Sequence, residues 1–181
     1  MRSKRTSLTV AVIIAVFATL DCGGLAAADE IHTAGDILLG VLPSAAAGLA
    51  LGHRDGQGAL QLGASLAVTL DVTVGLKLGI HAERPNGGEE SFPSGHTSIS
   101  FSSAEFVRRR YGWDYGGPAY AAAAFVAYSR VEAREHHPQD VVAGAVIGVL
   151  SSYIFTEPYK GWHVGVEGGR TSFGVRLSRH F

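Results

Sequence analysis

The chain has 181 residues, the size of one domain or of one domain with a small appendage. Hydrophobic residues make up 46% and charged residues 17%, which excludes a disordered, highly charged chain. The formal net charge of -1 argues against bulk nucleic-acid binding, and the single cysteine, Cys22, excludes an intramolecular disulfide framework. Recurring Ala-Gly runs favour closely packed helices, because small residues are enriched between membrane helices.

Residues 1–28 have the three parts of a secretory signal peptide. A basic start is followed by an uncharged stretch over residues 6–20 and by an Ala-rich segment before Asp29-Glu30. We therefore expect cleavage after Ala28. The alternative is an uncleaved first membrane helix, although the uncharged stretch is short of the roughly 20 residues that span a bilayer. Both interpretations export the segment that follows.

Five further helices are predicted, so the expected fold is an all-α bundle of five to six helices. Their ranges are Gly35–His53 (with a kink at Pro43), Gln57–Ile80, His96–Tyr111, Pro118–Arg134 and Pro138–Phe155. A polar, Gly-rich loop separates the second range from the third. Alternating apolar residues on both sides of Gly168-Gly169 predict a small C-terminal β-hairpin. We expect a helical domain over residues 29–156 and a hairpin tail over 157–181.

The distribution of basic residues favours a membrane protein. If the first segment exports the chain and every later helix crosses, eleven of the 15 basic residues lie on the cytoplasmic side. This is the positive-inside pattern, and it predicts a bacterial-type inner-membrane protein. The uncharged runs are each marginal for a span, so a soluble periplasmic protein remains the alternative. The four basic residues left on the periplasmic side are Lys77, Arg84, Arg130 and Arg134.

The eight histidines do not have the spacing of a metal site. None forms a His-x-x-x-His or His-Glu-x-x-His pair on one helix face. The sequence therefore predicts no metal centre. The residues expected to be simply packed or solvated are His32, His53, His163 and His180.

Three short segments together indicate anion chemistry. The Pro-Ser-Gly-His sequence at residues 93–96 begins a predicted helix, where free N–H groups and the helix dipole attract phosphate. Gly95 lets the backbone approach an oxyanion closely, and nearby arginines suit bidentate phosphate contacts. The expected phosphate-binding residues are Lys77, Arg84, Ser94, Gly95 and Arg130.

His136 and Asp140 lie four residues apart around a predicted helix start. Pro138 fits the first helical position, so Asp140 falls in the first turn and His136 lies just before it. A carboxylate in that place can accept the imidazole N–H and fix its tautomer. Taken alone, the pair could equally be no more than a helix cap.

The combination and order of the segments resemble the type-2 phosphatidic acid phosphatase and vanadium-haloperoxidase superfamily. Its signature is Lys-x6-Arg-Pro, then Pro-Ser-Gly-His, then Ser-Arg-x5-His-x3-Asp. Every fixed position has its match between Lys77 and Asp140. The matching residues are Lys77, Arg84, Pro85, Pro93, Ser94, Gly95, His96, Ser129, Arg130, His136 and Asp140. The departures lie outside the motifs, in the short chain, the less apolar helices and the C-terminal hairpin.

The resemblance implies a role for each catalytic position. His136 is the expected nucleophile, which forms a phosphohistidine, and Asp140 is its orienter. His96 is the expected general acid for the leaving group. The resemblance implies no metal and no cofactor, and it implies that vanadate inhibits as a mimic of the phosphoryl group.

The expected function is metal-independent hydrolysis of lipid phosphomonoesters or diphosphates at the outer face of the inner membrane. The alternatives are a soluble periplasmic acid phosphatase, a vanadate-dependent haloperoxidase, and a non-enzymatic helical membrane protein. The expected partners are a lipid phosphate or small phosphoester and the membrane, with no nucleic acid. The sequence leaves the lipid and the oligomeric state open.

Overall fold

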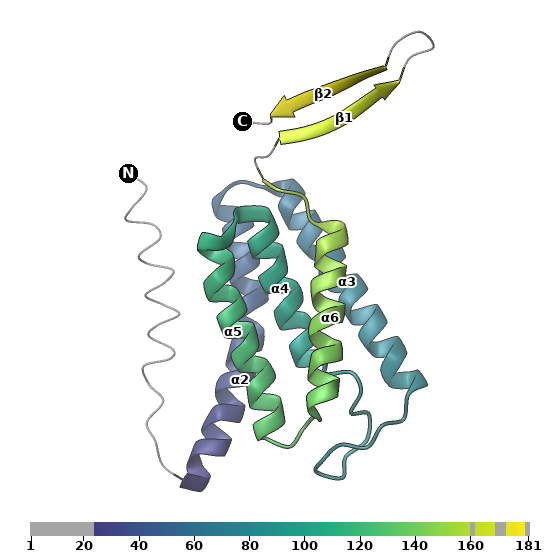
Figure 1. Ribbon diagram of the computed structural model, residues 1–181. Helices are drawn as coiled ribbons and strands as arrows, with labels where there is room; N and C mark the ends of the chain where they lie inside the picture. The colour runs from purple at the N-terminus through teal and green to yellow at the C-terminus, as the bar shows by residue number, and fades with distance from the viewer. Residues whose placement is uncertain (1–23, 160–161, 169–172, 180–181) are drawn as a thin grey trace.

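The computed structural model describes residues 24–159, 162–168 and 173–179, and a helical bundle makes up most of that part of the chain (Figure 1). Its helices confirm the predicted all-α core. Residues 1–23 lie outside the described residues, and the first described helix runs through Ala28, so signal cleavage stays a prediction. The helices are α2 (Gly24–Gly52), α3 (Gly56–Gly79), α4 (Gly95–Tyr111), α5 (Trp113–Glu132) and α6 (Pro138–Phe155).

Two helices begin well before their predicted starts, whereas α3 and α4 each begin one residue before theirs. α2 begins at Gly24 rather than Gly35, through an Ala-rich stretch with good helix propensity. α5 begins at Trp113, directly after Gly112. The φ of Gly112 is 92°, which ends α4 and separates it from α5. Pro118 therefore lies within the first two turns of α5, where its missing N–H costs at most one intrahelical hydrogen bond.

α4 lies at the centre of the bundle and packs against the other four described helices. Its contact with α6 depends on glycine. A Cβ at Gly144 would lie 2.5 Å from the Ser94 carbonyl oxygen, and one at Gly148 would lie 2.2 Å from that of Ser98. The two backbones therefore approach more closely than any side chain allows, as in the small-residue interfaces of membrane helices.

Three described helices are long and apolar enough to cross a membrane by length and composition. They comprise Glu30–Gly52, Gly56–Gly79 and Pro138–Phe155. A helix of 23 residues is about 35 Å long, which exceeds a hydrocarbon core of about 30 Å. All three present large apolar side chains on their outer faces. Examples are Ile37, Leu51, Leu60, Leu70, Val142, Val146, Leu150 and Ile154.

Two strands follow the bundle, β1 (Trp162–Gly168) and β2 (Phe173–Arg179). They pair antiparallel, with Trp162 opposite Arg179 and Gly168 opposite Phe173. Residues 169–172, which would form the turn between them, lie outside the described residues. The hairpin as a complete unit therefore stays a prediction.

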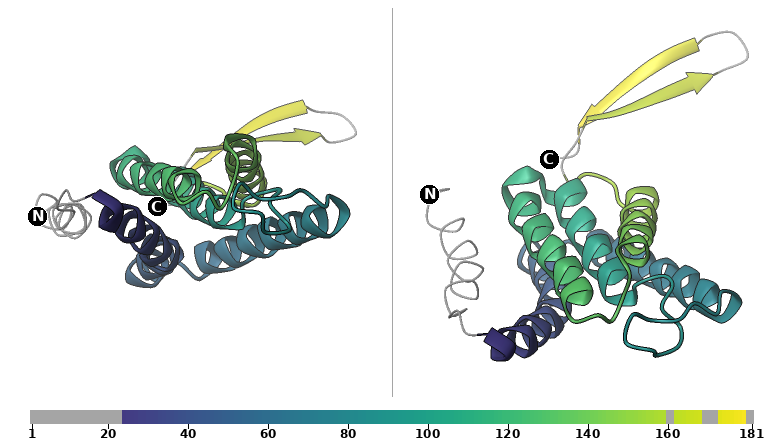
Figure 2. Two further views of the ribbon diagram at one scale, coloured as in Figure 1. Left: turned by 90° about the horizontal axis from the view of Figure 1, so that it is seen from below. Right: turned by 60° about the horizontal axis from the view of Figure 1, so that its bottom comes forward.

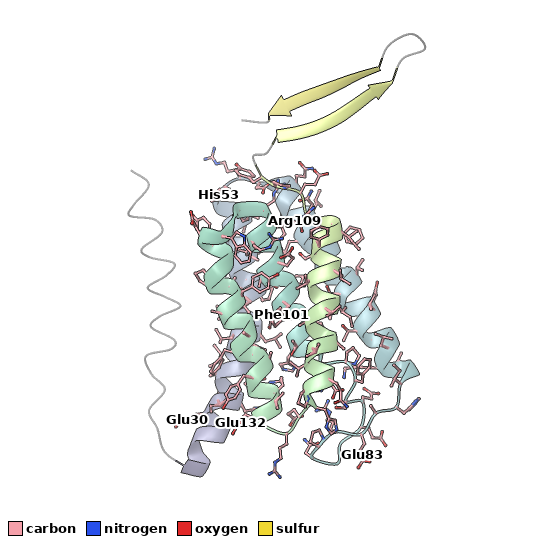
Figure 3. The ribbon with its side chains drawn as sticks, in the orientation of Figure 1. Glu30, His53, Glu83, Phe101, Arg109 and Glu132 are labelled. Atoms are coloured by element: carbon pink, nitrogen blue, oxygen red, sulfur yellow. The ribbon has the colours of Figure 1, made fainter. Side chains whose placement is uncertain are left out.

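The two ends of the bundle carry different polar groups. His53 and Arg109 lie at one end, whereas Glu83 and Glu132 lie at the other (Figure 3). The loop of residues 80–94 folds back across the second end, where the Ser94 N–H donates to the Asp140 carbonyl at 3.0 Å (Figure 2). The residues predicted from the motifs converge at this second end.

Candidate active site

The end of α5 places His136. Arg134 has a φ of 54°, its N–H donates to the Val131 carbonyl, and the Glu135 N–H donates to the Arg130 carbonyl. These two bonds form a Schellman motif, with an arginine at the position usually taken by glycine. The His136 N–H also donates to the Arg130 carbonyl, at 3.3 Å. His136 therefore leaves α5 directly beside the motif residue Arg130.

The start of α6 brings Asp140 to His136. One Asp140 oxygen, Oδ2, accepts from the His137 N–H at 2.9 Å and from the Ser91 hydroxyl at 2.5 Å. His136 Nδ1 lies 3.8 Å from the same oxygen. The pair is adjacent as predicted, but the distance exceeds a hydrogen bond because capping and Ser91 already use this oxygen. His136 Nδ1 is buried and has no hydrogen-bond partner within the described ranges.

The surroundings of His136 favour its neutral form. Burial, together with the charges of Lys77 and Arg84, lowers its pKa to about 4. The Ser91 backbone and the Asp140 carboxylate oppose this shift only in part. The imidazole is therefore available as a nucleophile over the whole neutral pH range.

The two cations of the first motif are held by oxygens of the chain. Lys77 donates from Nζ to the Glu90 carbonyl at 2.5 Å, and Arg84 donates from Nε to the Glu89 carbonyl at 3.0 Å. Arg84 also pairs with the carboxylate of Glu135. Glu135 belongs to none of the three motifs, although it directly precedes His136. A guanidinium binds carboxylate and phosphate oxygens in the same way, so the Glu135 carboxylate would compete with an anionic ligand for Arg84.

The second motif begins α4, and its serine is buried. Ser94 is the N-cap residue, and its Oγ accepts from the Thr97 hydroxyl at 3.0 Å. Gly95 and His96 are the first residues of α4, so their backbone amides lie at the positive end of its dipole. This geometry suits an anion, as the sequence predicted.

His96 and Arg130 share one carboxylate. Asp36 Oδ1, on α2, lies 3.1 Å from His96 Nε2 and accepts from Arg130 Nη1 at 2.8 Å. Arg130 Nη2 donates to the His32 carbonyl at 2.8 Å. His32 therefore belongs to a polar network and is not merely packed or solvated as expected.

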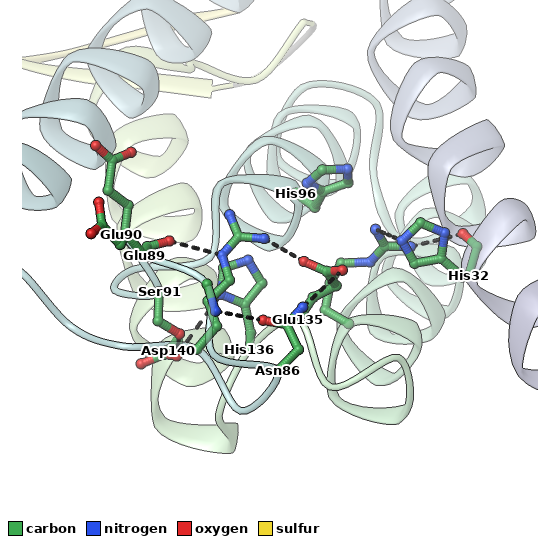
Figure 4. A network of polar contacts seen from close by, with 12 residues as sticks. His32, Asn86, Glu89, Glu90, Ser91, His96, Glu135, His136 and Asp140 are labelled. Atoms are coloured by element: carbon green, nitrogen blue, oxygen red, sulfur yellow. Dashed lines mark hydrogen bonds and ion pairs between the residues drawn. The ribbon is translucent and has the colours of Figure 1, made fainter.

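The residues predicted from the three motifs lie at the end of the bundle that carries Glu83 and Glu132 in Figure 3, and Figure 4 draws His96, His136 and Asp140 there from close by. One group surrounds His136 and contains Lys77, Arg84 and Asp140. The other surrounds His96 and contains Arg130. Over the described ranges, no three His, Cys, Asp or Glu side chains are arranged to hold a metal ion. Each imidazole thus lies among its own set of charged groups, His136 beside Lys77, Arg84 and Asp140, and His96 beside Asp36 and Arg130.

The sequence of this chain matches the family model of the PAP2 superfamily over residues 58–161. This chain belongs to the PAP2 superfamily. The match includes all three motifs and confirms the resemblance seen in the sequence.

Three characterised relatives are similar to parts of the chain. Lipid A 4'-phosphatase of Helicobacter pylori is 34% identical over 138 residues, which is 70% of this chain and 69% of that protein. Lipid A 1-phosphatase of Porphyromonas gingivalis is 35% identical over 88 residues, 41% of this chain and 20% of that protein. Undecaprenyl-diphosphatase BcrC of Bacillus subtilis is 29% identical over 79 residues, 42% of this chain and 39% of that protein.

One solved structure has the same fold. The crystal structure of Aquifex aeolicus LpxE superposes with a TM-score of 0.54 at 21% identity, and the match covers 75% of this chain and 96% of that one. The helical bundle therefore has the same fold as that protein.

Proposed function

We propose that this protein is a lipid phosphate phosphatase that hydrolyses a phosphomonoester or diphosphate through a phosphohistidine on His136. One observation carries the proposal: a buried imidazole with a pKa of about 4 lies beside Asp140 and faces the charges of Lys77 and Arg84. A neutral imidazole among cations is what nucleophilic attack on a phosphoryl dianion requires.

In the first step, His136 attacks phosphorus. Its Nδ1 faces Asp140, so Nε2 forms the new N–P bond while the bond from phosphorus to the leaving oxygen breaks. His96 gives that oxygen a proton, so an alcohol or a phosphate monoester departs. The Asp140 carboxylate stabilises the imidazolium side of the adduct.

The cations offset the charge that shifts during this step. Lys77 and Arg84 exchange the Glu90 carbonyl and the Glu135 carboxylate for phosphoryl oxygens, and the Gly95 amide adds a backbone donor. In the second step, water attacks phosphorus and the N–P bond breaks. His96, now neutral, takes the water proton, and inorganic phosphate leaves.

The lipid nature of the substrate is supported by the position of the site. Lys77 lies in the last turn of α3, and Asp140 lies in the first turn of α6, and both helices are candidate spans. A site at the ends of membrane helices lies at the level of lipid headgroups. The relatives named above act on lipid A and undecaprenyl diphosphate. The charge asymmetry of the sequence supports the further proposal that this end faces the periplasmic side of a bacterial inner membrane.

The test is a phosphate-release assay on purified protein in detergent micelles. It compares phosphatidic acid, a lipid A, a polyprenyl diphosphate and a water-soluble alkyl phosphate, with His136→Ala as the control. We expect the wild-type protein to release phosphate from one or more of the lipids, and we expect vanadate to inhibit this release. EDTA should leave the rate unchanged, and the His136→Ala variant should release no phosphate. Faster release from the soluble ester than from every lipid would contradict the lipid assignment. Unchanged release by His136→Ala would contradict the mechanism.

A further inference from the structure

Asp36 on α2 contacts residues of two motifs at once. Its Oδ1 lies within hydrogen-bond distance of His96 Nε2 and of Arg130 Nη1, and its Oδ2 lies 3.4 Å from His32 Nδ1. Asp36 lies far from the motifs in the sequence. More than half of α2 and most of α3 lie between it and Lys77, the first motif residue. The family match begins at residue 58, so nothing in it accounts for Asp36.

The backbone of α2 is adapted to this contact by Gly35. A Cβ on Gly35 would lie 2.1 Å from Ser129 Oγ and 2.6 Å from Arg130 Nη2. α2 therefore rests directly against the Ser-Arg pair of the third motif. Because Asp36 is the next residue, the same close approach brings its carboxylate to His96. Figure 4 shows His32 and His96 projecting from different helices toward the same part of the site.

Asp36 is the anionic group that faces His96. Burial lowers the pKa of His96, and Arg130 on α5 and His32 on α2 add to this effect, while Asp36 opposes it by charge and by a hydrogen bond. A second set of charged groups acts on His136. There Lys77 of α3 and Asp140 of α6 face its imidazole, and Arg84 pairs with Glu135.

We propose that Asp36 is the positioning residue of His96. Its carboxylate accepts the Nε2–H of His96 and thereby fixes both the ring orientation and the tautomer. The Nδ1 proton is then the one given to the leaving oxygen, as the bond from phosphorus to that oxygen breaks. His96 is left neutral, with Nε2–H still on Asp36. Each imidazole of the site thus has its own carboxylate, Asp140 for His136 and Asp36 for His96.

The inference rests on the proposed phosphatase function, and the experiment separates proton donation from phosphate binding. Asp36→Asn keeps the shape of the side chain and removes its charge. Wild type and variant are compared on an alkyl phosphate, whose leaving group needs a proton, and on p-nitrophenyl phosphate, whose leaving group does not. We expect kcat/KM to fall about 100-fold on the alkyl ester and less than about tenfold on the aryl ester.

The ratio between the two esters isolates the acid step. Asp36→Asn also frees Arg130, but both esters carry the same phosphoryl group, so any change in Arg130 affects them equally. Glu30→Gln is the matched control, because Glu30 is an exposed carboxylate on the same helix. We expect Glu30→Gln to leave kcat/KM unchanged on both esters. If Asp36→Asn lowered kcat/KM equally on both esters, or on neither, the proposal would be overturned.

A second measurement does not need turnover. An NMR titration follows the His96 ring, assigned by the loss of its signals in His96→Gln. Because Asp36 opposes the groups that lower the His96 pKa, we expect Asp36→Asn to lower that pKa further. The alkaline limb of kcat/KM for the alkyl ester should move to lower pH with it. If the pKa of His96 were the same in Asp36→Asn as in the wild type, the proposal would be overturned. This test does not depend on turnover, so it still decides the role of Asp36 if the wild-type protein hydrolyses no phosphate ester.

Discussion

The two ends of the bundle both use an aspartate–arginine pair, but they use it differently. At the end away from the site, Asp55 accepts two hydrogen bonds from Arg110, at 2.6 and 2.7 Å, and one each from Tyr111 and the Gly58 N–H. Both members of that pair are buried. At the site end, Asp36 leaves 44% of its side chain exposed and divides its oxygens between Arg130 and two histidines.

The difference separates structural from chemical use of the same residue types. Burial alone would raise the pKa of Asp55, but hydrogen bonds from Arg110, Gly58 and Tyr111 lower it to about 2. A fully satisfied pair of this kind holds one arrangement and has no capacity for a ligand. At the site end, Lys77 and Arg84 bind oxygens that a substrate can replace.

The largest expected effect is on the nucleophile. His136→Gln should lower kcat about 10⁴-fold or more, because it removes the proposed nucleophile of the covalent intermediate. Thermal unfolding in detergent should be little changed, since His136 Nδ1 has no partner among the described residues. Residual turnover within tenfold of wild type would contradict the assignment.

A substitution in the Asp55–Arg110 pair should lower stability and leave kcat unchanged. Asp55→Asn leaves the buried Arg110 without its counter-charge and should cost about 3–5 kcal/mol in the free energy of unfolding. The measurement is denaturant unfolding in micelles, together with kcat per folded molecule, which we expect to stay unchanged. A fall in kcat without a loss of stability would show that this end also takes part in catalysis.

The pH dependence tests the charge environment of the site. His136 must be neutral to attack, and its pKa is about 4, so kcat/KM should fall about tenfold per pH unit below that value. Removing a nearby cation lets the pKa of His136 rise, so Lys77→Gln should move the acid limb to higher pH. Arg109→Gln, at the opposite end, is the control and should leave it in place. An acid limb near 6.5 in the wild type would be evidence against a buried nucleophile.

The smallest effect is expected at Glu135. Because its carboxylate competes with substrate for Arg84, Glu135→Gln should lower KM by up to about fivefold and leave kcat unchanged. Glu132→Gln, an exposed change at the end of α5 three residues before Glu135, is the control. A higher KM in Glu135→Gln would mean that Glu135 holds Arg84 in its productive position.

The motifs made the site partly predictable. Lys77, Arg84, His96, Arg130, His136 and Asp140 were all expected, and the structure brings them to one end of the bundle. Spacing within a motif predicts local geometry well, as for Asp140 in the first turn of α6. It does not predict which of several partners a carboxylate takes, and Asp140 is shared with Ser91 and His137.

Two other features of the site, the Asp36–His96 contact and the end of α5, depend on helix packing and backbone conformation that the sequence pattern does not predict. Gly35 lets α2 approach Ser129 and Arg130 of α5 closely, and Asp36, the next residue, lies within hydrogen-bond distance of His96. An acidic residue in an apolar helix was the one available signal, since ionisable groups in such helices commonly mark function. α5 was predicted to continue to Arg134, because an arginine in the left-handed region gives no local signal of a helix end, as a glycine would.

The most direct test of the central claim is to trap the intermediate. The enzyme is mixed with a lipid phosphate, denatured rapidly at alkaline pH and digested, and the phosphopeptides are identified by mass spectrometry. We expect phosphate on His136 in the wild type and none in His136→Gln. Phosphate on a serine such as Ser94, or an enzyme that turns over without ever carrying phosphate, would contradict it.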